Sequence, residues 1–95
     1  MNELVCKQGD VIFKEGERDG SMYQLLSGGA SVYAKYGEAD EKFLFERRVG
    51  DYFGEMAVLE NRDRSATAVS LENGTTLNQF MKTTSVFSLR RIQPW

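Results

Sequence analysis

The stretch FGEMAVLENRDRSATA, residues 53–68, joins a short helical segment to a strand. Met, Ala, Leu and Glu are good helix formers, so residues 53–60 predict a helix of about one or two turns. Gly54 stands at the beginning of this helix and Asn61 at its end. Residues 65–71 are small or β-branched with few charges, which favours a strand. The sequence therefore predicts a helix followed closely by a strand, with Arg64 just before that strand.

The start of this helix predicts a binding site for an anion. The first N–H groups of a helix have no partners inside it, and the helix dipole also favours negative charge there. Arg64 offers a guanidinium, whose planar fork suits a phosphate group. Ser65 adds a hydroxyl, and Ala66 adds a backbone amide with little steric bulk. Because Glu55 can accept a hydrogen bond from a hydroxyl beside this anion site, a sugar phosphate suits both halves.

The same charged residues also allow a purely structural interpretation. Glu55 in the first turn complements the helix dipole. Arg64 pairs with Glu55, Asp63 or Asp51 in a surface ion pair, which is worth about 0–1 kcal/mol. Taken alone, these residues leave both the anion site and the surface pair open.

Short strands separated by glycine turns make up most of the chain. The sequence has nine glycines and a single proline, Pro94. The apolar or alternating runs between the turns are rich in β-branched and aromatic residues, which favour strands. The expected strands lie at residues 11–13, 22–26, 31–36, 43–45 and 66–71, with 75–80 as a further candidate. This rhythm predicts an all-β barrel, roll or sandwich.

Length and composition exclude several classes of protein. A chain of 95 residues has room for one domain, which we expect to span residues 1–95. His is absent and Cys6 is the single cysteine, which excludes His-dependent catalytic triads, His- or Cys-clustered metal sites and an internal disulfide. Without a signal-peptide pattern or an apolar run of about 18 residues, we expect a cytoplasmic protein that does not enter a membrane.

The charge is distributed unevenly. The net charge of −2 gives no global field for nucleic acid, so no direct nucleic-acid partner is expected. Residues 73–95 hold Lys82, Arg90 and Arg91 and no acid. We interpret this basic end as a segment packed on the acidic body of the domain, in preference to a basic surface for a partner.

The helix–strand stretch also resembles a known cassette. Residues 53–57 (FGEMA) followed by 64–68 (RSATA) resemble the phosphate-binding cassette of cyclic nucleotide-binding domains. Residues 9–17, 22–28 and 49–54 are similar to the strands and glycine turns that precede the cassette in that family. The resemblance covers residues 8 to about 78, the expected extent of the roll. It implies a mainly β fold, a jelly-roll-like β-roll (double-stranded β-helix) with a short phosphate-binding helix.

The resemblance implies a role for each cassette residue. Glu55 accepts a hydrogen bond from the ribose 2′-hydroxyl, and Arg64 pairs with the charged exocyclic oxygen of the cyclic phosphate. The amides of Ala57 and Ala66 bind phosphate oxygens, and Gly54 lets the turn approach the ligand. The ligand-contacting set that it implies is Gly54, Glu55, Met56, Ala57, Arg64, Ser65 and Ala66.

The base of the nucleotide would lie on apolar side chains from the inner face of the roll. Val32, Leu44 and Phe45 are the candidates, and core packing explains them equally well. Family members selective for guanine often have Thr after the cassette arginine, whereas Ala there goes with adenine. Ser65 lies between these two cases, and we favour cAMP over cGMP as the ligand.

The carboxyl end departs from the family pattern. Relatives continue into two further helices, the last of which covers the base, whereas residues 79–95 do not match that pattern. We therefore expect a divergent end in which Trp95 or Phe87 stacks on the base. We also expect exposed apolar surface that a second copy or an effector domain covers.

These observations together predict a cyclic-nucleotide sensor. It would have no catalysis, cofactor or metal of its own. The alternative is a β-roll that has lost its ligand and serves as a protein-interaction module. An enzyme is the least favoured interpretation, because the chain has no His and its acids form no paired motif.

Overall fold

The fold is built almost entirely from short strands. A computed structural model describes residues 2–60 and 62–81. The expected strand Thr75–Phe80 is present as part of a longer one, and the expected helix begins at Glu55. The elements in chain order are β1 (Asn2–Cys6), β2 (Val11–Phe13), β3 (Ser21–Ser27), β4 (Ala30–Ala34), β5 (Lys42–Arg47), β6 (Tyr52–Phe53), α1 (Glu55–Glu60), β7 (Thr67–Ser70) and β8 (Thr75–Met81).

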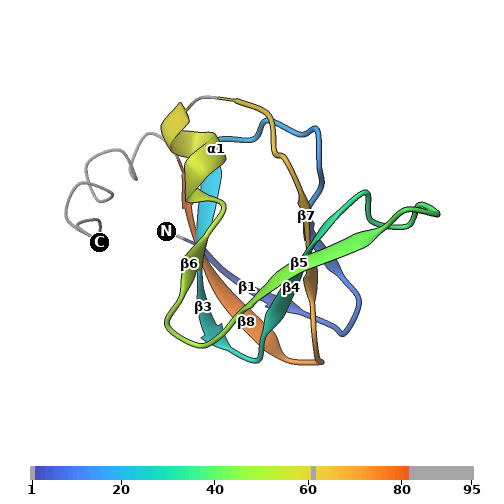
Figure 1. Cartoon of the computed structure of the whole chain (residues 1–95). Helices are drawn as coiled ribbons and strands as arrows, with labels where there is room; N and C mark the ends of the chain where they lie inside the picture. The colour runs from blue at the N-terminus through green and yellow to red at the C-terminus, as the bar shows by residue number, and fades with distance from the viewer. Residues whose placement is uncertain (1, 61, 82–95) are drawn as a thin grey trace.

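Two antiparallel sheets form a roll (Figure 1). One sheet has the strand order β1-β8-β3-β6 and the other has the order β2-β7-β4-β5. Consecutive strands often lie in different sheets, so the chain crosses repeatedly between the two layers. Helix α1 lies at one end of the roll, beside β6 (Figure 1). The mainly β fold expected from the glycine rhythm is confirmed.

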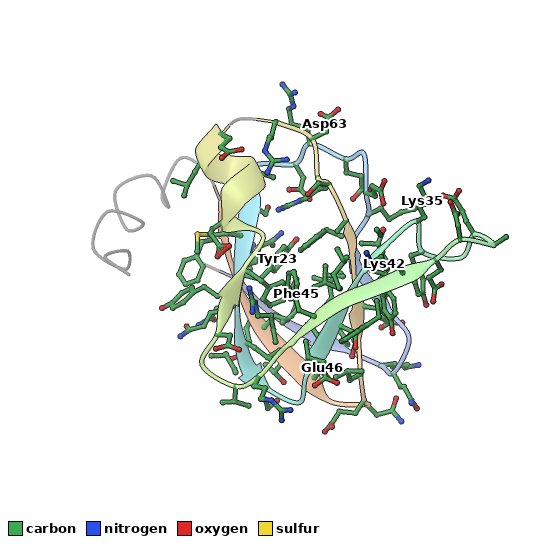
Figure 2. All side chains as sticks on the ribbon, in the orientation of Figure 1. Tyr23, Lys35, Lys42, Phe45, Glu46 and Asp63 are labelled. Carbon is green, nitrogen blue, oxygen red and sulfur yellow. The ribbon has the colours of Figure 1, made fainter. Side chains whose placement is uncertain are left out.

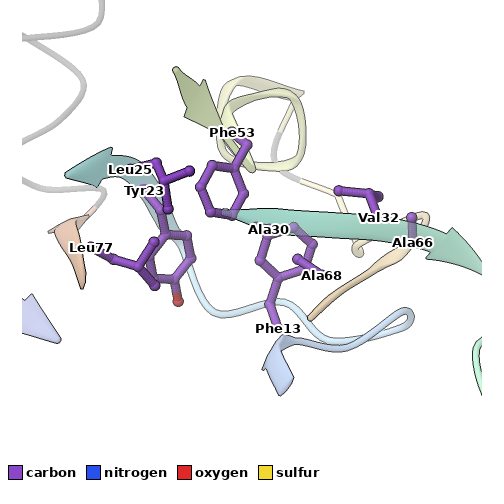
Figure 3. Packing of buried hydrophobic residues seen from close by; sticks show 9 residues of the cluster. All are labelled: Phe13, Tyr23, Leu25, Ala30, Val32, Phe53, Ala66, Ala68 and Leu77. Carbon is purple, nitrogen blue, oxygen red and sulfur yellow. The ribbon is translucent and has the colours of Figure 1, made fainter. Parts of the chain in front are cut away.

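Aromatic rings from three strands form the centre of the core (Figure 3). The Tyr23 ring stacks on Phe53 with 5.6 Å between ring centroids, and Phe13 lies 5.9 Å from Tyr23 and 6.0 Å from Phe53. Aromatic pairs at such distances add about 0.5–1.5 kcal/mol beyond the burial of their area. Since Phe13 belongs to one sheet and Tyr23 and Phe53 to the other, this triad joins the two layers.

The sheets extend beyond the expected limits of the roll, residues 8–78. Strand β1 pairs along its whole length with β8, which continues to Met81. Leu4 and Cys6 of β1 pack against the core, so alternate residues face inward even though the stretch is short. The predictions for Asn61 and for residues 82–95, including Phe87 and Trp95, lie outside the described residues.

A glycine at the β3–β4 turn is required by both conformation and space. Gly28 has φ of +79°, in the left-handed region that favours glycine. A Cβ atom there would lie 2.3 Å from Thr75 Oγ1 and 2.8 Å from the Thr75 Cα. Thr75 is fully buried, and its hydroxyl hydrogen-bonds with Gly29 and Glu72, so it cannot move aside without losing these contacts.

We therefore expect Gly28→Ala to destabilise the fold much more than Gly37→Ala. Gly37 has a similar φ of +83°, but nothing lies within 4 Å of its would-be Cβ. The conformational penalty of about 1–2 kcal/mol is common to both variants, whereas overpacking adds about 1–3 kcal/mol at Gly28 alone. Urea unfolding of both variants measures the difference, and equal stabilities would contradict the close contact with Thr75.

Candidate functional site

Arg64 is a buried cation at the end of the roll that carries α1. Only 3% of its surface is exposed, although it belongs to the connection between α1 and β7. Its backbone is held by the β2–β3 loop: the Arg64 N–H donates to the Glu17 carbonyl at 2.8 Å, and its carbonyl accepts from the Gly16 N–H at 2.8 Å. The guanidinium carbon lies 4.3 Å from the centroid of the Phe13 ring, so the charge rests on the aromatic core.

The guanidinium of Arg64 connects the cassette to the start of β3. Its Nη1 donates to the Gly54 carbonyl at 2.7 Å, and its Nη2 donates to Asp19 Oδ1 at 2.6 Å and to the Ser21 carbonyl. Its Nε is buried and has no hydrogen-bond partner among the described residues. A buried donor without a partner is rare in folded proteins.

The surface ion pairs considered for Arg64 are not those that form. Asp63 pairs with Arg18 at 2.9 Å, and the Asp51 carboxylate accepts from the Arg48 N–H at 2.8 Å. Among the described residues, no ion pair within 4 Å joins Arg64 to Glu55. The acidic partner of Arg64 is Asp19, at 2.6 Å.

Gly54 leaves room for the Arg64 guanidinium because it has no side chain. Its φ is +81°, and a Cβ atom there would lie 2.7 Å from Arg64 Nη1 and 3.3 Å from the Phe13 ring. The absence of a side chain therefore lets the carbonyl of Gly54 meet the guanidinium directly, just before α1 begins at Glu55. Glycine is therefore required at this position for the packing of Arg64, and not only to let a ligand approach the turn.

A cavity of about 210 Å³ opens beside Arg64. Gly54, Ala57, Arg64, Ser65 and Ala66, all expected at the site, contribute to its lining. The three side chains expected under a base line it as well: Val32, Leu44 and Phe45. In Figure 2 the Phe45 side chain lies between the two sheets. The structure thus gathers an anion-binding end and an apolar wall around one space.

Glu55 and Met56 belong to α1, and Glu55 is not part of this lining. Glu55 is half-buried at the start of the helix. Burial raises the pKa of its carboxyl, while Arg47, its own backbone N–H and Arg64 act in the opposite direction. Within the described residues, the Glu55 carboxylate is in no ion pair within 4 Å. Arg47 and Arg64 therefore favour its ionised form from beyond ion-pair distance.

Several residues of this site were not predicted from the sequence. The Asp19 carboxylate, which pairs with Arg64, also accepts from the Ser21 N–H at 3.0 Å. Phe13, Phe53 and Arg62 line the cavity without having been expected there. The pairing of β2 with β7 brings Phe13 beside the cassette, and no local sequence signal reveals such a long-range pairing.

Across residues 2–60 and 62–81, no group of three or more Cys, Asp or Glu side chains is arranged to hold a metal ion. In the same residues, no helix has the length and hydrophobicity needed to span a membrane.

Comparisons of sequence place this geometry among known proteins. The family model described as "Cyclic nucleotide-binding domain" matches residues 3–83. The chain is 35% identical over 75 residues to the cGMP-dependent protein kinase of Plasmodium berghei, covering 79% of this chain and 8% of the kinase. It is 37% identical over 68 residues to the cAMP-dependent protein kinase regulatory subunit of Candida albicans, covering 70% of this chain and 14% of that subunit. The chain thus spans a small part of these relatives.

The fold is also similar to solved structures. The Thermus thermophilus catabolite activator protein matches with a TM-score of 0.83 and 28% identity, covering 96% of this chain and 42% of that one. This match, with the family model, confirms both the resemblance noted in residues 53–68 and the expected β-roll.

Loss of the Asp19 charge is expected to destabilise the fold. Asp19→Asn keeps the shape of the side chain but leaves the buried Arg64 guanidinium without its anion. A hydrogen bond to a charged group is worth about 1.5–3 kcal/mol, so a loss of this size is expected. Asp63→Asn is the control, because the Asp63–Arg18 pair is more than half exposed and worth about 0–1 kcal/mol. Equal losses in urea unfolding would show that Asp19 is an ordinary surface partner.

Removal of the Glu55 charge is expected to stabilise the protein at neutral pH. A raised pKa means that the fold favours the neutral carboxyl, so the ionised form costs stability as the pH rises through that pKa. Glu55→Gln should therefore unfold at a higher temperature than the wild type at pH 7. The advantage should vanish below about pH 4.3, the ordinary pKa of Glu. Thermal unfolding from pH 7 to below about pH 4.3 measures this difference, with Glu3→Gln, at an exposed position, as the control. A Glu55→Gln variant that is less stable than the wild type at pH 7 would contradict the expected cost of the charge.

Proposed function

The chain belongs to the cyclic nucleotide-binding domain family, and on this premise we propose that its cavity binds a cyclic nucleotide, with cAMP preferred over cGMP. The observation that carries this proposal is the buried Arg64 guanidinium, which lines the cavity and has an unpartnered Nε. A buried cation with a donor to spare, next to small residues and an apolar wall, suits a ligand with one anionic and one aromatic end.

The phosphate is assigned to the Arg64 end of the cavity. A guanidinium has five N–H donors, and three of them are engaged by Gly54, Asp19 and Ser21. The Nε–H and one Nη1–H remain for phosphate oxygens. The backbone amides of Ala57 and Ala66 and the hydroxyl of exposed Ser65 supply further donors at the same end. The first turn of α1, which includes Met56, adds amides with no partner inside the helix.

The sugar and base are assigned to the remaining walls. Glu55 accepts a hydrogen bond from the ribose 2′-hydroxyl, as the family resemblance implies. The base lies on Val32, Leu44 and Phe45, of which Leu44 is 40% and Phe45 39% exposed. These apolar side chains offer no partner to the polar edge of a base. Because guanine presents more polar edge groups than adenine, and burying them unpaired is costly, this wall favours cAMP.

The module is proposed to act as a sensor. It has no catalysis of its own, works in the cytoplasm and passes ligand occupancy to an effector domain or a second copy of the chain. Relatives named as a cAMP-dependent protein kinase regulatory subunit and a cGMP-dependent protein kinase support a regulatory role. Exposed apolar side chains such as Val49 (62% exposed) and Phe43 (52% exposed) give such a partner a surface to contact.

Titration calorimetry of the chain with cAMP, cGMP and AMP tests the proposal. We expect cAMP to bind about tenfold more tightly than cGMP, a difference of about 1.4 kcal/mol, and AMP to bind far more weakly than either. Binding of neither cyclic nucleotide would overturn the proposal and favour the interaction module that has lost its ligand. Tighter binding of cGMP would overturn the preference alone.

Replacing Arg64 by lysine, which lacks the planar guanidinium, should weaken binding of the cyclic phosphate. Arg64→Lys keeps a positive charge but loses the planar pair of donors. We expect at least a tenfold loss of cAMP affinity, since a charge-assisted contact contributes about 1.5–3 kcal/mol. Arg18→Lys is the control, because Arg18 forms an exposed ion pair away from the cavity lining. Circular dichroism checks that both variants fold, and unchanged affinity in a folded Arg64→Lys would remove Arg64 from the site.

A further inference from the structure

Strand β1 has a neighbouring strand on one side only. It stands at the end of the sheet order β1-β8-β3-β6, and β8 pairs with it from Asn2 to Cys6 (Figure 1). The other strands at a sheet edge are shorter or irregular: β6 has two residues, and register shifts interrupt the pairing of β2 and of β5. A regular edge strand offers unpaired N–H and C=O groups with which another extended chain can pair.

The backbone groups of Glu3 and Val5 point toward the free edge of β1. The carbonyl of Cys6 accepts from the Gly74 N–H at 2.9 Å, so it points to the β8 side. The backbone groups of successive residues in an antiparallel strand point to alternate sides, so those of Glu3 and Val5 point away from β8. A further strand at this edge would therefore bond to these two residues.

The outward side chains at this edge form a row of acid, apolar residue and base. Leu4 and Cys6 pack against the core, so the residues between and beside them face outward. These are Glu3, Val5 and Lys7, all of them exposed. Val5 is 71% exposed, the largest fraction for a large hydrophobic side chain in the described part of the chain. Within that part, neither Glu3 nor Lys7 is in an ion pair within 4 Å.

This row is complementary to itself when it is read in the opposite direction. In an antiparallel arrangement with a second copy, Glu3 lies opposite Lys7 of that copy, and Lys7 lies opposite its Glu3. Val5 then lies opposite its own counterpart on a two-fold axis. Opposite charges that face each other across two strands stabilise the pair, and a contact between the same patch of both chains closes as a dimer.

We propose that the free edge of β1 pairs with β1 of a second copy of this chain, antiparallel and centred on Val5. The two Val5 residues exchange backbone hydrogen bonds, and the two Glu3–Lys7 pairs set the register. The N–H and the carbonyl of Lys7 are already bonded to Asp10, so the backbone pairing is short and the dimer is weak. None of the described residues that line the cavity belongs to β1, so this interface does not depend on the proposed function.

Sedimentation equilibrium of the full chain tests the association. We expect a monomer–dimer equilibrium with a Kd of about 1 mM or tighter. Val5→Lys brings two like charges together at the centre of the pairing and should weaken the dimer at least about tenfold. Val49→Lys is the matched control, because Val49 is 62% exposed and lies between β5 and β6. It adds the same charge and should leave the Kd within about twofold of the wild type.

An exchange of the two charges tests the register. Glu3→Lys places like charges opposite each other at both ends of the pairing, so the dimer should weaken about threefold or more. Lys7→Glu alone should have the same effect. The double variant Glu3→Lys with Lys7→Glu restores two opposite-charge pairs and the net charge of the wild type. Its Kd should therefore return to within about twofold of the wild type.

The outcomes decide between this interface and others. A chain that stays monomeric at about 1 mM would overturn the proposal and leave the edge to a strand of another protein. A dimer that Val5→Lys weakens no more than Val49→Lys does, or a double variant without recovery, would overturn it and place the contact on another surface. Circular dichroism checks folding, and if Val5→Lys does not fold, the charge exchange at exposed positions decides. The Val5→Lys variant should bind cAMP as the wild type does, so failure of the interface leaves the proposed function standing.

Discussion

The contact of the buried Arg64 guanidinium with its surroundings holds the functional end of the roll together. A charge that is 3% exposed is costly unless it is well compensated, and here the compensation comes from three separate segments. Asp19 comes just before β3 and the Ser21 carbonyl is at its start. The Gly54 carbonyl precedes α1, and Phe13 lies on β2. These segments must therefore adopt a common arrangement before the charge can be buried.

The same side chain serves folding and recognition. The donors that Arg64 directs to Asp19, Ser21 and Gly54 fix the cassette against β3, and its remaining donors are those proposed for the phosphate. A ligand on those donors binds a group that already ties α1 to the rest of the roll. Occupancy of the cavity is thereby linked to the stability of the α1 end, which is the physical requirement for a sensor.

Local patterns were enough to predict most of the strands and the helix, but not β1 or β6, and Phe53, expected in the helix, belongs to β6. Glycine turns and β-branched runs gave β2, β3 and β7, and the Met, Ala, Leu and Glu of residues 55–60 gave α1. Gly54 and Ser65 were predicted from the chemistry of a local anion site, and Ala57 from the family resemblance; all three line the cavity.

Contacts between distant segments were not predictable in this way. Asp19 hydrogen-bonds with Arg64 across 45 positions of the chain. Phe13 comes beside the cassette only because β2 pairs with β7. No periodicity in the sequence encodes such pairings. Residues that compensate a buried charge therefore cannot be predicted from a single sequence, whereas the residues of a local anion-binding turn can.

The central claim is that the cavity beside Arg64 binds the phosphate of a cyclic nucleotide. A titration of the ¹⁵N-labelled chain with cAMP, followed residue by residue through the backbone amide signals, tests it most directly. We expect the largest saturable shifts at residues 54–57 and 64–66, with smaller ones at Leu44 and Phe45 on the apolar wall. Shifts confined to other parts of the roll, or none at saturating cAMP, would contradict the account.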